Sequence, residues 1–404
     1  MRLKIAIVVH GRFHAFDLAN ALLKRGHDVT ILTNYPKWAV KRFGIPRERV
    51  QAFWPHGVAA KLAFRLSGLN IINDPSCWLL PAFSRWAASR LSRERWDVIH
   101  MWSGASKEIL GSALDPSTLK LLMRGSAHIR EQRRLLQEEQ SRATGSIDMP
   151  DEWIIEREER EYALVDVIVT LSSFSHRSFL ENGIPPHRLA RIPLGVATNQ
   201  FRPSDEHIRQ RCHRIQSGEP LRVLYTGLLS FRKGIWDFAE VVRRLPVGRF
   251  RFQFVGTILK EMRGVVSELS GLAEFVPRLP QSSLPERYAD NDLFVFPTIE
   301  DGFAAVLAQA HAAGLPILTT PNCGGPDLIS EGETGWVLPI RNPKAFIDRL
   351  LWCDSHRAEL AAMVRHSYDS FQPRDWNDVA ADFEAMCQHQ IARMQALAHA
   401  SHGR

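Results

Sequence analysis

The sequence has 404 residues, of which 45% are hydrophobic and 24% are charged, and these proportions are ordinary for a soluble globular protein. That length allows two or three domains, each large enough to bury its own core. The formal net charge of +7 implies attraction to an anionic partner.

The distribution of residues argues against several classes of protein. No apolar stretch approaches the roughly 18 residues that a transmembrane helix requires. The run Met1–His10 is short for a secretory signal, lacks a cleavage site and precedes an amphipathic pattern, so we expect a strand there. The five cysteines are scattered and never form C-x-x-C, which argues against disulfides or zinc and fits a reducing, cytoplasmic compartment. Aromatic residues do not interleave with a basic strand face, so no nucleic-acid partner is predicted.

The chain begins with a predicted β-α-β unit in its first 33 residues. Leu3–Val9 is a continuous apolar run, as expected of a parallel strand buried on both faces. Apolar residues then recur at helical spacing from Phe16 to Leu23, and Gly26 stands where a helix C-cap glycine would. Further strands of this half are predicted at 29–33, 96–100, 119–123 and 167–170.

The same pattern starts again at residue 221, with a strand at 221–226, a helix at 235–244 and a strand at 250–255. Two such starts predict two doubly wound α/β domains. The boundary is placed near Arg191–Val196, and the polar residues 204–219 are interpreted as a linker or surface loop. The predicted units are an N-terminal domain at 1–195, a C-terminal domain at 196–372 and a long amphipathic helix at 373–404.

The segment Asp301–Gln309 carries the most informative pattern. It lies between an apolar run at 293–297 and a second apolar run at 314–319, which predicts a strand, a short loop, a helix that starts at Asp301-Gly302, and another strand. A helix N-terminus offers free backbone N–H groups and a partial positive charge, which suit a phosphate. Gln309 is expected near the same helix face as Asp301, because eight residues make slightly more than two turns.

This pattern resembles the donor-site signature of glycosyltransferase family four, in which a strand is followed by E-G-F-G, a second Glu eight residues after the first, and C-G-x-P-V. Three positions differ here, since Asp301 stands for the first Glu, Ala304 for the second Gly and Gln309 for the second Glu. The resemblance covers nearly the whole chain and is strongest from 221 to 340. It implies an α/β fold of the GT-B type, with two doubly wound Rossmann-like domains facing a cleft and a last helix that returns to the N-terminal domain.

The resemblance also implies roles for individual residues of the second half. Asp301 would lie beside the donor sugar, Gln309 would bind the nucleotide ribose, and the helix start at Gly302, Phe303 and Ala304 would hold the diphosphate.

A second cluster, Arg232-Lys233-Gly234, precedes the helix at 235–244. Two cations beside a glycine at a strand-to-helix turn make a diphosphate clamp. Lys233-Gly234 matches the Lys-Gly of the family. Leu228 stands where the family has Arg after Gly227, and Arg232 can supply the second charge.

Two positions of the first half are candidates for the same site. His10–His14 follows the first strand, where open α/β sheets bind ligands, and family members close a glycine-containing loop here over donor phosphate and acceptor, so Gly11 is the candidate. The G-x-G-x-x-G pattern is absent, which argues against a nicotinamide enzyme. His128 follows the strand at 119–123, where many family members place a His close to the donor sugar; it could bond a sugar hydroxyl or stabilise developing charge.

Other charged segments are given structural interpretations. Asp290-Asn291-Asp292 resembles a D-x-D metal motif but precedes its strand, so we expect a turn, no metal and no cofactor. Glu156–Glu161 is predicted to be an exposed helix face, and Asp327 a helix cap. The segment 79–96 combines Trp86 with arginines and suits either an anionic membrane surface or, as the favoured reading, a helix packed on the N-terminal sheet.

The sequence therefore predicts a retaining, metal-independent, hexosyltransferase-type enzyme. It would move a sugar from a nucleotide-diphosphate donor to a carbohydrate or lipid-linked hydroxyl acceptor in surface polysaccharide or glycolipid biosynthesis, in the cytoplasm or at the inner face of the membrane. His128 and Asp301 are the predicted catalytic residues. The predicted donor-binding residues are Gly11, Gly227, Arg232, Lys233, Gly302, Phe303, Ala304 and Gln309. Two alternatives stay open: a non-catalytic sugar-nucleotide-binding subunit and a sugar-nucleotide epimerase.

Overall fold

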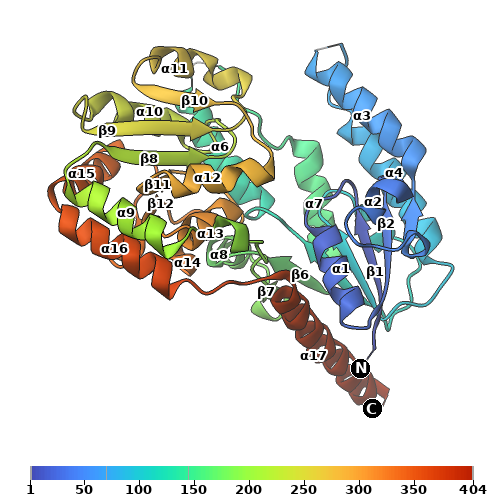
Figure 1. Ribbon diagram of the computed structural model, residues 1–404. Coiled ribbons are helices and arrows are strands. Elements are labelled where there is room, and N and C mark those ends of the chain that lie inside the picture. Colours follow the sequence, from blue (N-terminus) through green and yellow to red (C-terminus); the bar gives the residue numbers. More distant parts are fainter. Residues whose placement is uncertain (1, 70, 144, 403–404) are drawn as a thin grey trace.

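The computed structural model describes residues 2–69, 71–143 and 145–402 and contains two parallel β-sheets, each flanked by helices (Figure 1). The first sheet has seven strands in the order β3-β2-β1-β4-β5-β6-β7, and the second has six in the order β10-β9-β8-β11-β12-β13. In the first sheet β1 is an interior strand, with Ile7 opposite Ile31 of β2 and His100 of β4. Both orders are those of doubly wound α/β domains, so the predicted fold class is confirmed.

The first domain alternates strands and helices from residue 4 to residue 191. Its strands are β1 (Lys4–Val9), β2 (Asp28–Thr33), β3 (Val50–Ala52), β4 (Val98–Trp102), β5 (Leu119–Met123), β6 (Val167–Thr170) and β7 (Leu189–Arg191). Its helices are α1 (Ala15–Lys24), α2 (Lys37–Lys41), α3 (Trp54–Gly68), α4 (Ser76–Leu91), α5 (Lys107–Leu110), α6 (Ile129–Arg142), α7 (Glu152–Leu164) and α8 (Ser173–Glu181), with short 3-10 turns at Arg47–Arg49 and Pro186–Arg188.

The second domain repeats the alternation from residue 205 to residue 370. Its strands are β8 (Leu221–Thr226), β9 (Phe250–Val255), β10 (Ala273–Val276), β11 (Leu293–Phe296), β12 (Ile317–Thr319) and β13 (Gly335–Val337). Its helices are α9 (Asp205–Gln216), α10 (Ile235–Arg244), α11 (Arg263–Glu268), α12 (Leu284–Ala289), α13 (Ala305–Ala312), α14 (Gly325–Leu328), α15 (Pro343–Ser355) and α16 (Arg357–Ser370), with 3-10 turns at Asn199–Phe201, Lys260–Met262 and Gln281–Ser283.

The first β-α-β unit follows the sequence pattern closely. All residues of β1 after Lys4 are buried, because helices cover both faces of a parallel sheet. Helix α1 ends at Gly26, whose φ of +87° is left-handed and whose N–H donates to the Leu23 carbonyl. That geometry is a glycine C-cap, as the sequence predicted.

The final helix, α17 (Trp376–His402), returns to the first domain, as predicted. Figure 1 shows it beside α1, far from the helices that precede it in the chain. Val379 and Phe383 are buried in the core of the first domain, and Glu384 accepts hydrogen bonds from Arg25 at 2.7 and 3.0 Å.

Two predictions about individual segments can be compared with the structure. Residues 204–219, expected to be a linker, contain helix α9, which Ser204 caps by accepting from the His207 N–H. The helix was missed because its buried face includes Arg211, a residue type rarely found buried, which here donates to four backbone carbonyls. In the segment 79–96, Phe83, Ala87 and Leu91 pack into the core under the first sheet, which agrees with the favoured interpretation of a packed helix.

Candidate functional site

A cavity of about 510 Å³ lies where the two domains meet, at the carboxyl ends of their strands. The loops after β1, β4 and β5 form one wall, and the ends of β8 and β11 with the start of α13 form the other. Open parallel sheets bind ligands at this edge. A larger cavity of about 650 Å³ opens at the opposite edge of the second sheet, near the first residues of β8, β9 and β10, and contains none of the predicted site residues.

Asp301 is the centre of a polar network on the second-domain wall. Its Oδ1 accepts from the backbone N–H groups of Phe303, at 3.0 Å, and Ala304, at 2.8 Å. Its Oδ2 lies 2.6 Å from the Lys233 ammonium. Burial alone would raise the pKa of Asp301, but Lys233 and these hydrogen bonds hold it below its ordinary value, so the carboxylate is charged.

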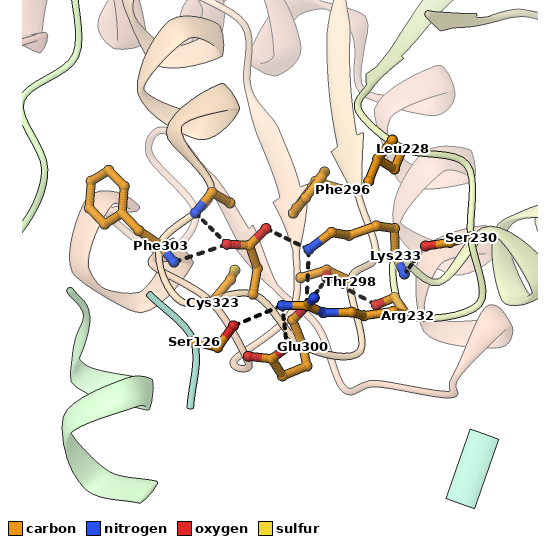
Figure 2. A network of polar contacts seen from close by, with 12 residues as sticks. Ser126, Leu228, Ser230, Arg232, Lys233, Phe296, Thr298, Glu300, Phe303 and Cys323 are labelled. Atoms are coloured by element: carbon orange, nitrogen blue, oxygen red, sulfur yellow. Dashed lines mark hydrogen bonds and ion pairs between the residues drawn. The ribbon is translucent and has the colours of Figure 1, made fainter. Parts of the chain in front are cut away.

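The two predicted cations converge on the same corner, as Figure 2 shows. Lys233 also donates to the Glu300 carbonyl at 3.1 Å. Arg232 lies 2.7 Å from the Glu300 carboxylate and donates to the Ser126 hydroxyl of the first domain at 2.9 Å. Gly234, which follows them, has a φ of +70° and lies so close to Pro297 that a side chain would strike its carbonyl oxygen. The loop therefore needs a glycine exactly one residue after the lysine.

The helix predicted to start at Asp301-Gly302 begins later, at Ala305, which corrects that expectation. The reason is the turn closed by the Asp301 carboxylate, together with a left-handed conformation at Ala304, whose φ is +64°. The N–H groups of Phe303 and Ala304 are thus already bound to Asp301. The helix start that lines the cavity is formed by Ala305 and Val306.

The three glycines predicted to bind the donor occupy different positions relative to the cavity. Gly227 lines the cavity, with a φ of +146°. Gly302 lies at the contact between the two domains, against Gly125. Gly11 does not line the cavity; its N–H donates to Asn34 at 2.8 Å and stabilises the loop after β1, whose Phe13 and His14 do line it.

His128 and Gln309 also lie off the cavity. His128 is buried and caps α6, with Nδ1 accepting from the Arg130 N–H at 3.3 Å. Its ring packs on Tyr162 and Phe179, and burial lowers its pKa to about 4, so it is neutral. The loop after β5 places Arg124, Gly125 and Ser126 on the cavity and then turns inward to His128, whose contact with the donor sugar stays a prediction.

Gln309 is buried beneath this wall on α13. Its side-chain oxygen accepts from the Tyr288 hydroxyl at 3.1 Å, and that hydroxyl also bonds Thr226, which lines the cavity. The connection from Gln309 to the cavity therefore passes through two other side chains.

Sequence reasoning missed two acidic residues. Glu300 is fully buried and accepts from the Ala127 N–H, at 3.0 Å, and from the Gln132 amide, at 3.1 Å, so that it joins the domains. Glu158 belongs to the segment 156–161 that was expected to be exposed, yet it is buried and lines the cavity. The usable signal was helical spacing, because Glu158 shares a face of α7 with Ile155 and Tyr162.

Glu158 anchors an arginine on the first-domain wall. Arg124 lies 2.9 Å from its carboxylate and donates to Gln132 at 2.7 Å. Tyr162 donates a further hydrogen bond to Glu158. Trp102 and His14, whose rings are 5.3 Å apart, complete this wall, and burial lowers the pKa of His14 to about 4.

The remaining acidic candidates have structural partners. Asp292 pairs with Arg214 at 2.6 Å and accepts from the Arg222 N–H, as a strand-entry residue would. Asp327 is not a helix cap as expected; it accepts from the Ser173 N–H and pairs with Arg191, both in the first domain. Within the part of the chain that the structure describes, no three His, Cys, Asp or Glu side chains are grouped to hold a metal ion.

Two family models match the chain. Residues 12–200 match the model described as Glycosyltransferase Family 4, and residues 220–354 match the model described as Glycosyl transferases group 1. The chain belongs to glycosyltransferase family 4. Together the two models cover every strand of the two sheets except β1.

The curated relatives that this chain matches are distant. It is 23% identical over 248 residues to the amylovoran biosynthesis glycosyltransferase AmsK of Erwinia amylovora, a match that covers 57% of this chain and 59% of that protein. It is 24% identical over 344 residues to the GDP-mannose-dependent alpha-(1-6)-phosphatidylinositol monomannoside mannosyltransferase of Mycobacterium tuberculosis, covering 81% of this chain and 86% of the relative. The first of these matches thus spans little more than half of the relative's length.

The fold of this chain is shared by solved structures. Anabaena Alr3699/HepE in complex with UDP superposes with a TM-score of 0.66 at 14% sequence identity, over 96% of this chain and 100% of that one. Within the described residues, no helix is both long and apolar enough to cross a bilayer.

Proposed function

We propose that this protein transfers a glycosyl group from a nucleoside-diphosphate sugar to a hydroxyl acceptor, with retention of configuration and without a metal ion. The observation that carries the proposal is the convergence of Lys233, Arg232 and the first turn of α13 on one cavity between the domains. Two cations and a helix N-terminus aimed at one corner form a site for a diphosphate.

The leaving group of the reaction would be the nucleoside diphosphate. Its developing negative charge would be stabilised by Lys233 and Arg232, in the role that a metal ion has in other transferases. Lys233 is pre-positioned by Asp301, and Arg232 by Glu300 and Ser126, so neither has to be reordered when the substrate binds. Asp301, bound to two N–H groups and an ammonium, is suited to orient these groups and to contact the donor sugar.

We propose retention of configuration because the chain belongs to this family. No protein nucleophile is assigned. The acceptor would bind against the first-domain wall, where Arg124, Glu158, Trp102 and His14 offer charged groups beside aromatic faces. A polyhydroxylated acceptor suits such a surface, because sugars stack on aromatic rings and bond to charged groups. Its source would be surface polysaccharide or glycolipid assembly, the processes in the names of the two relatives above.

The test is the release of nucleoside diphosphate from a panel of UDP-, GDP- and ADP-sugars in EDTA, with candidate acceptors, for the wild type and Lys233→Ala. We expect one donor to turn over and the variant to lose at least about 100-fold in kcat/KM, as when a transition-state charge partner is removed. Lys344→Ala is the matched control, since that lysine forms a surface ion pair with Asp348 on α15.

Three outcomes contradict the proposal in different ways. Calorimetry that detects no binding of any donor removes the donor site. Binding with no release, whatever the acceptor, identifies a sugar-nucleotide-binding subunit. Conversion of the donor into an isomeric nucleotide sugar identifies an epimerase.

A further inference from the structure

Helix α3 has its large apolar side chains on the outside. Trp54, Val58 and Leu62 are 57%, 61% and 58% exposed, and their spacing places them on one face of the helix. The opposite face is buried through Ala60 and Ala63. A helix on a globular domain normally has the reverse arrangement, with its larger apolar residues toward the core.

The exposed apolar surface continues beyond both ends of this helix. Leu69 and Ile71, which follow α3, are 70% and 62% exposed. Tyr35 and Trp38 are exposed in the segment after β2, next to the Asn34 backbone against which Gly57 of α3 packs. Figure 1 shows α3 and α4 projecting together from the first domain. We name the face formed by Trp54, Val58, Leu62, Leu69 and Ile71 the α3 strip.

The charges around the α3 strip are predominantly positive. Residues 37–72 contain seven lysines and arginines and one acidic residue, Glu48. Lys61 and Arg65 lie on the same face of α3 as Trp54 and Val58, at helical spacing, and both are exposed. Long basic side chains can extend beside apolar neighbours and keep their charges in a polar layer.

These features suit a membrane surface better than a second copy of this chain. A two-fold dimer through this face would bring Lys61 and Arg65 of both copies into one interface, which costs free energy through like-charge repulsion. An anionic bilayer instead accepts the apolar side chains at the level of the headgroups and pairs the cations with lipid phosphates. Trp54 at one end of the strip is also typical of residues at a membrane interface.

We propose that the α3 strip binds the surface of an anionic lipid bilayer, with α3 lying in the plane of the headgroups. At 15 residues α3 is shorter than the roughly 20 residues that span a bilayer, so it lies on the surface. Binding by this face does not require the transfer reaction. It holds the first domain, whose wall would bind the acceptor, in one orientation relative to the membrane.

The experiment is flotation of the full chain with vesicles of phosphatidylcholine and phosphatidylglycerol in equal parts, and with vesicles of phosphatidylcholine alone, without any donor. The wild type is expected to float with the anionic vesicles and to be released as salt is raised. The variant Val58→Glu with Leu62→Glu is expected to lose at least about tenfold in partition coefficient, since two carboxylates replace two inserted apolar groups.

The control for added charge is Val247→Glu with Leu397→Glu, which makes the same changes at positions exposed by 88% and 61% outside the strip. It is expected to change partitioning less than about twofold, because single charges far from the surface are screened. A second variant, Lys61→Glu with Arg65→Glu, keeps the apolar residues and is expected to abolish the preference for anionic vesicles. Circular dichroism and donor affinity show that each variant is folded.

Four results would overturn the proposal. The first is a wild type that stays in the soluble fraction, and the second is equal binding of the wild type to neutral and anionic vesicles. The third is an equal loss of partition coefficient in the strip variant and in its control. The fourth is a wild type that light scattering shows to be a dimer and that the strip variant converts to a monomer. The last result would assign the face to a second copy of the chain.

Discussion

Gly302 and Gly125 touch across the domain boundary so closely that a methyl group on Gly302 would lie 2.0 Å from the Gly125 carbonyl oxygen. Gly302 belongs to the loop of Asp301, and Gly125 to the loop that carries Arg124 and Ser126. The contact fixes how far apart the two walls of the cavity are. It requires glycine because of the close approach of two backbones, since Gly302 does not have a left-handed φ.

Gly302→Ala is therefore expected to push the two loops apart and to lower donor turnover at least about tenfold, since angstrom-scale misplacement of reacting groups is costly. Its effect on the free energy of unfolding should be about 1–3 kcal/mol, as for other overpacked positions. Gly264→Ala, in α11 with open space around it, is the control and should leave turnover unchanged while raising the free energy of unfolding by no more than about 1 kcal/mol. Unaltered turnover in Gly302→Ala would show that this contact does not set the spacing.

Glu300→Gln should destabilise the junction of the domains. The carboxylate accepts from Ala127 and Gln132 and pairs with Arg232, and an amide cannot accept from all of them. We expect a loss of about 2–3 kcal/mol in denaturant unfolding, below the value for a fully buried pair because Arg232 is partly exposed. Glu268→Gln, which breaks an exposed pair with Arg243, should change stability by less than about 0.5 kcal/mol. A similar small change in Glu300→Gln would contradict its role at the junction.

Glu158→Gln tests the first-domain wall. It removes the charge that holds Arg124 and should lower turnover at least about tenfold, with donor affinity changed less than about twofold because Lys233 and Arg232 are untouched. Glu159→Gln is the neighbouring control, since its carboxylate pairs with Arg130 on the surface. Steady-state kinetics in the acceptor, with donor titration by calorimetry, separate the two effects. Weaker donor binding in Glu158→Gln with unchanged turnover would reassign this residue to the donor side.

Stability should fall as the pH is lowered from about 6.5 toward 4. Burial lowers the pKa of five histidines from 6.5 to about 4 or, for His100, about 3. A base whose pKa is lower in the folded state than in the unfolded state makes its full contribution to stability above the unfolded-state pKa. As the pH falls, the unfolded chain takes up the proton first, so the free energy of unfolding decreases. Each such histidine contributes a slope of at most about 1.4 kcal/mol per pH unit between these values.

Urea unfolding across this range measures the slope directly. His128→Gln should reduce it by the contribution of one group, whereas His213→Gln, on the surface-directed part of α9, should leave it unchanged. A free energy of unfolding that stays flat from pH 6.5 to pH 5 would contradict the buried neutral state of these rings.

The sequence predicted the architecture well because its strongest signals are local. Continuous apolar runs such as Leu3–Val9 have one stable environment, a parallel strand covered on both faces. Lys233-Gly234 and Asp301-Gly302 were found because loop geometry restricts which residues fit there. The packing of α17 on α1 was available from its apolar spacing combined with the resemblance to a family.

The failures involve partners that are distant in sequence. Glu158 seemed solvated because its segment is charged, and only the folded chain brings Arg124 beside it. The contact of the His128 ring with Tyr162 was likewise not foreseen, because it depends on packing between helices. The α13 start shifted because the Asp301 carboxylate competes with the helix for the N–H groups of Phe303 and Ala304.

The return of α17 to the first domain also affects the order in which the two domains finish folding during translation. The first sheet is complete at Arg191, but Val379 and Phe383, which fill its core beside α1, are translated about 190 residues later. At about 5–20 residues per second, the first domain waits roughly 10–40 seconds with an apolar surface uncovered. The second domain, whose strands all precede α17, can close its core within that interval. A released chain that ends at residue 372 should therefore resist protease in the second domain and remain sensitive in the first.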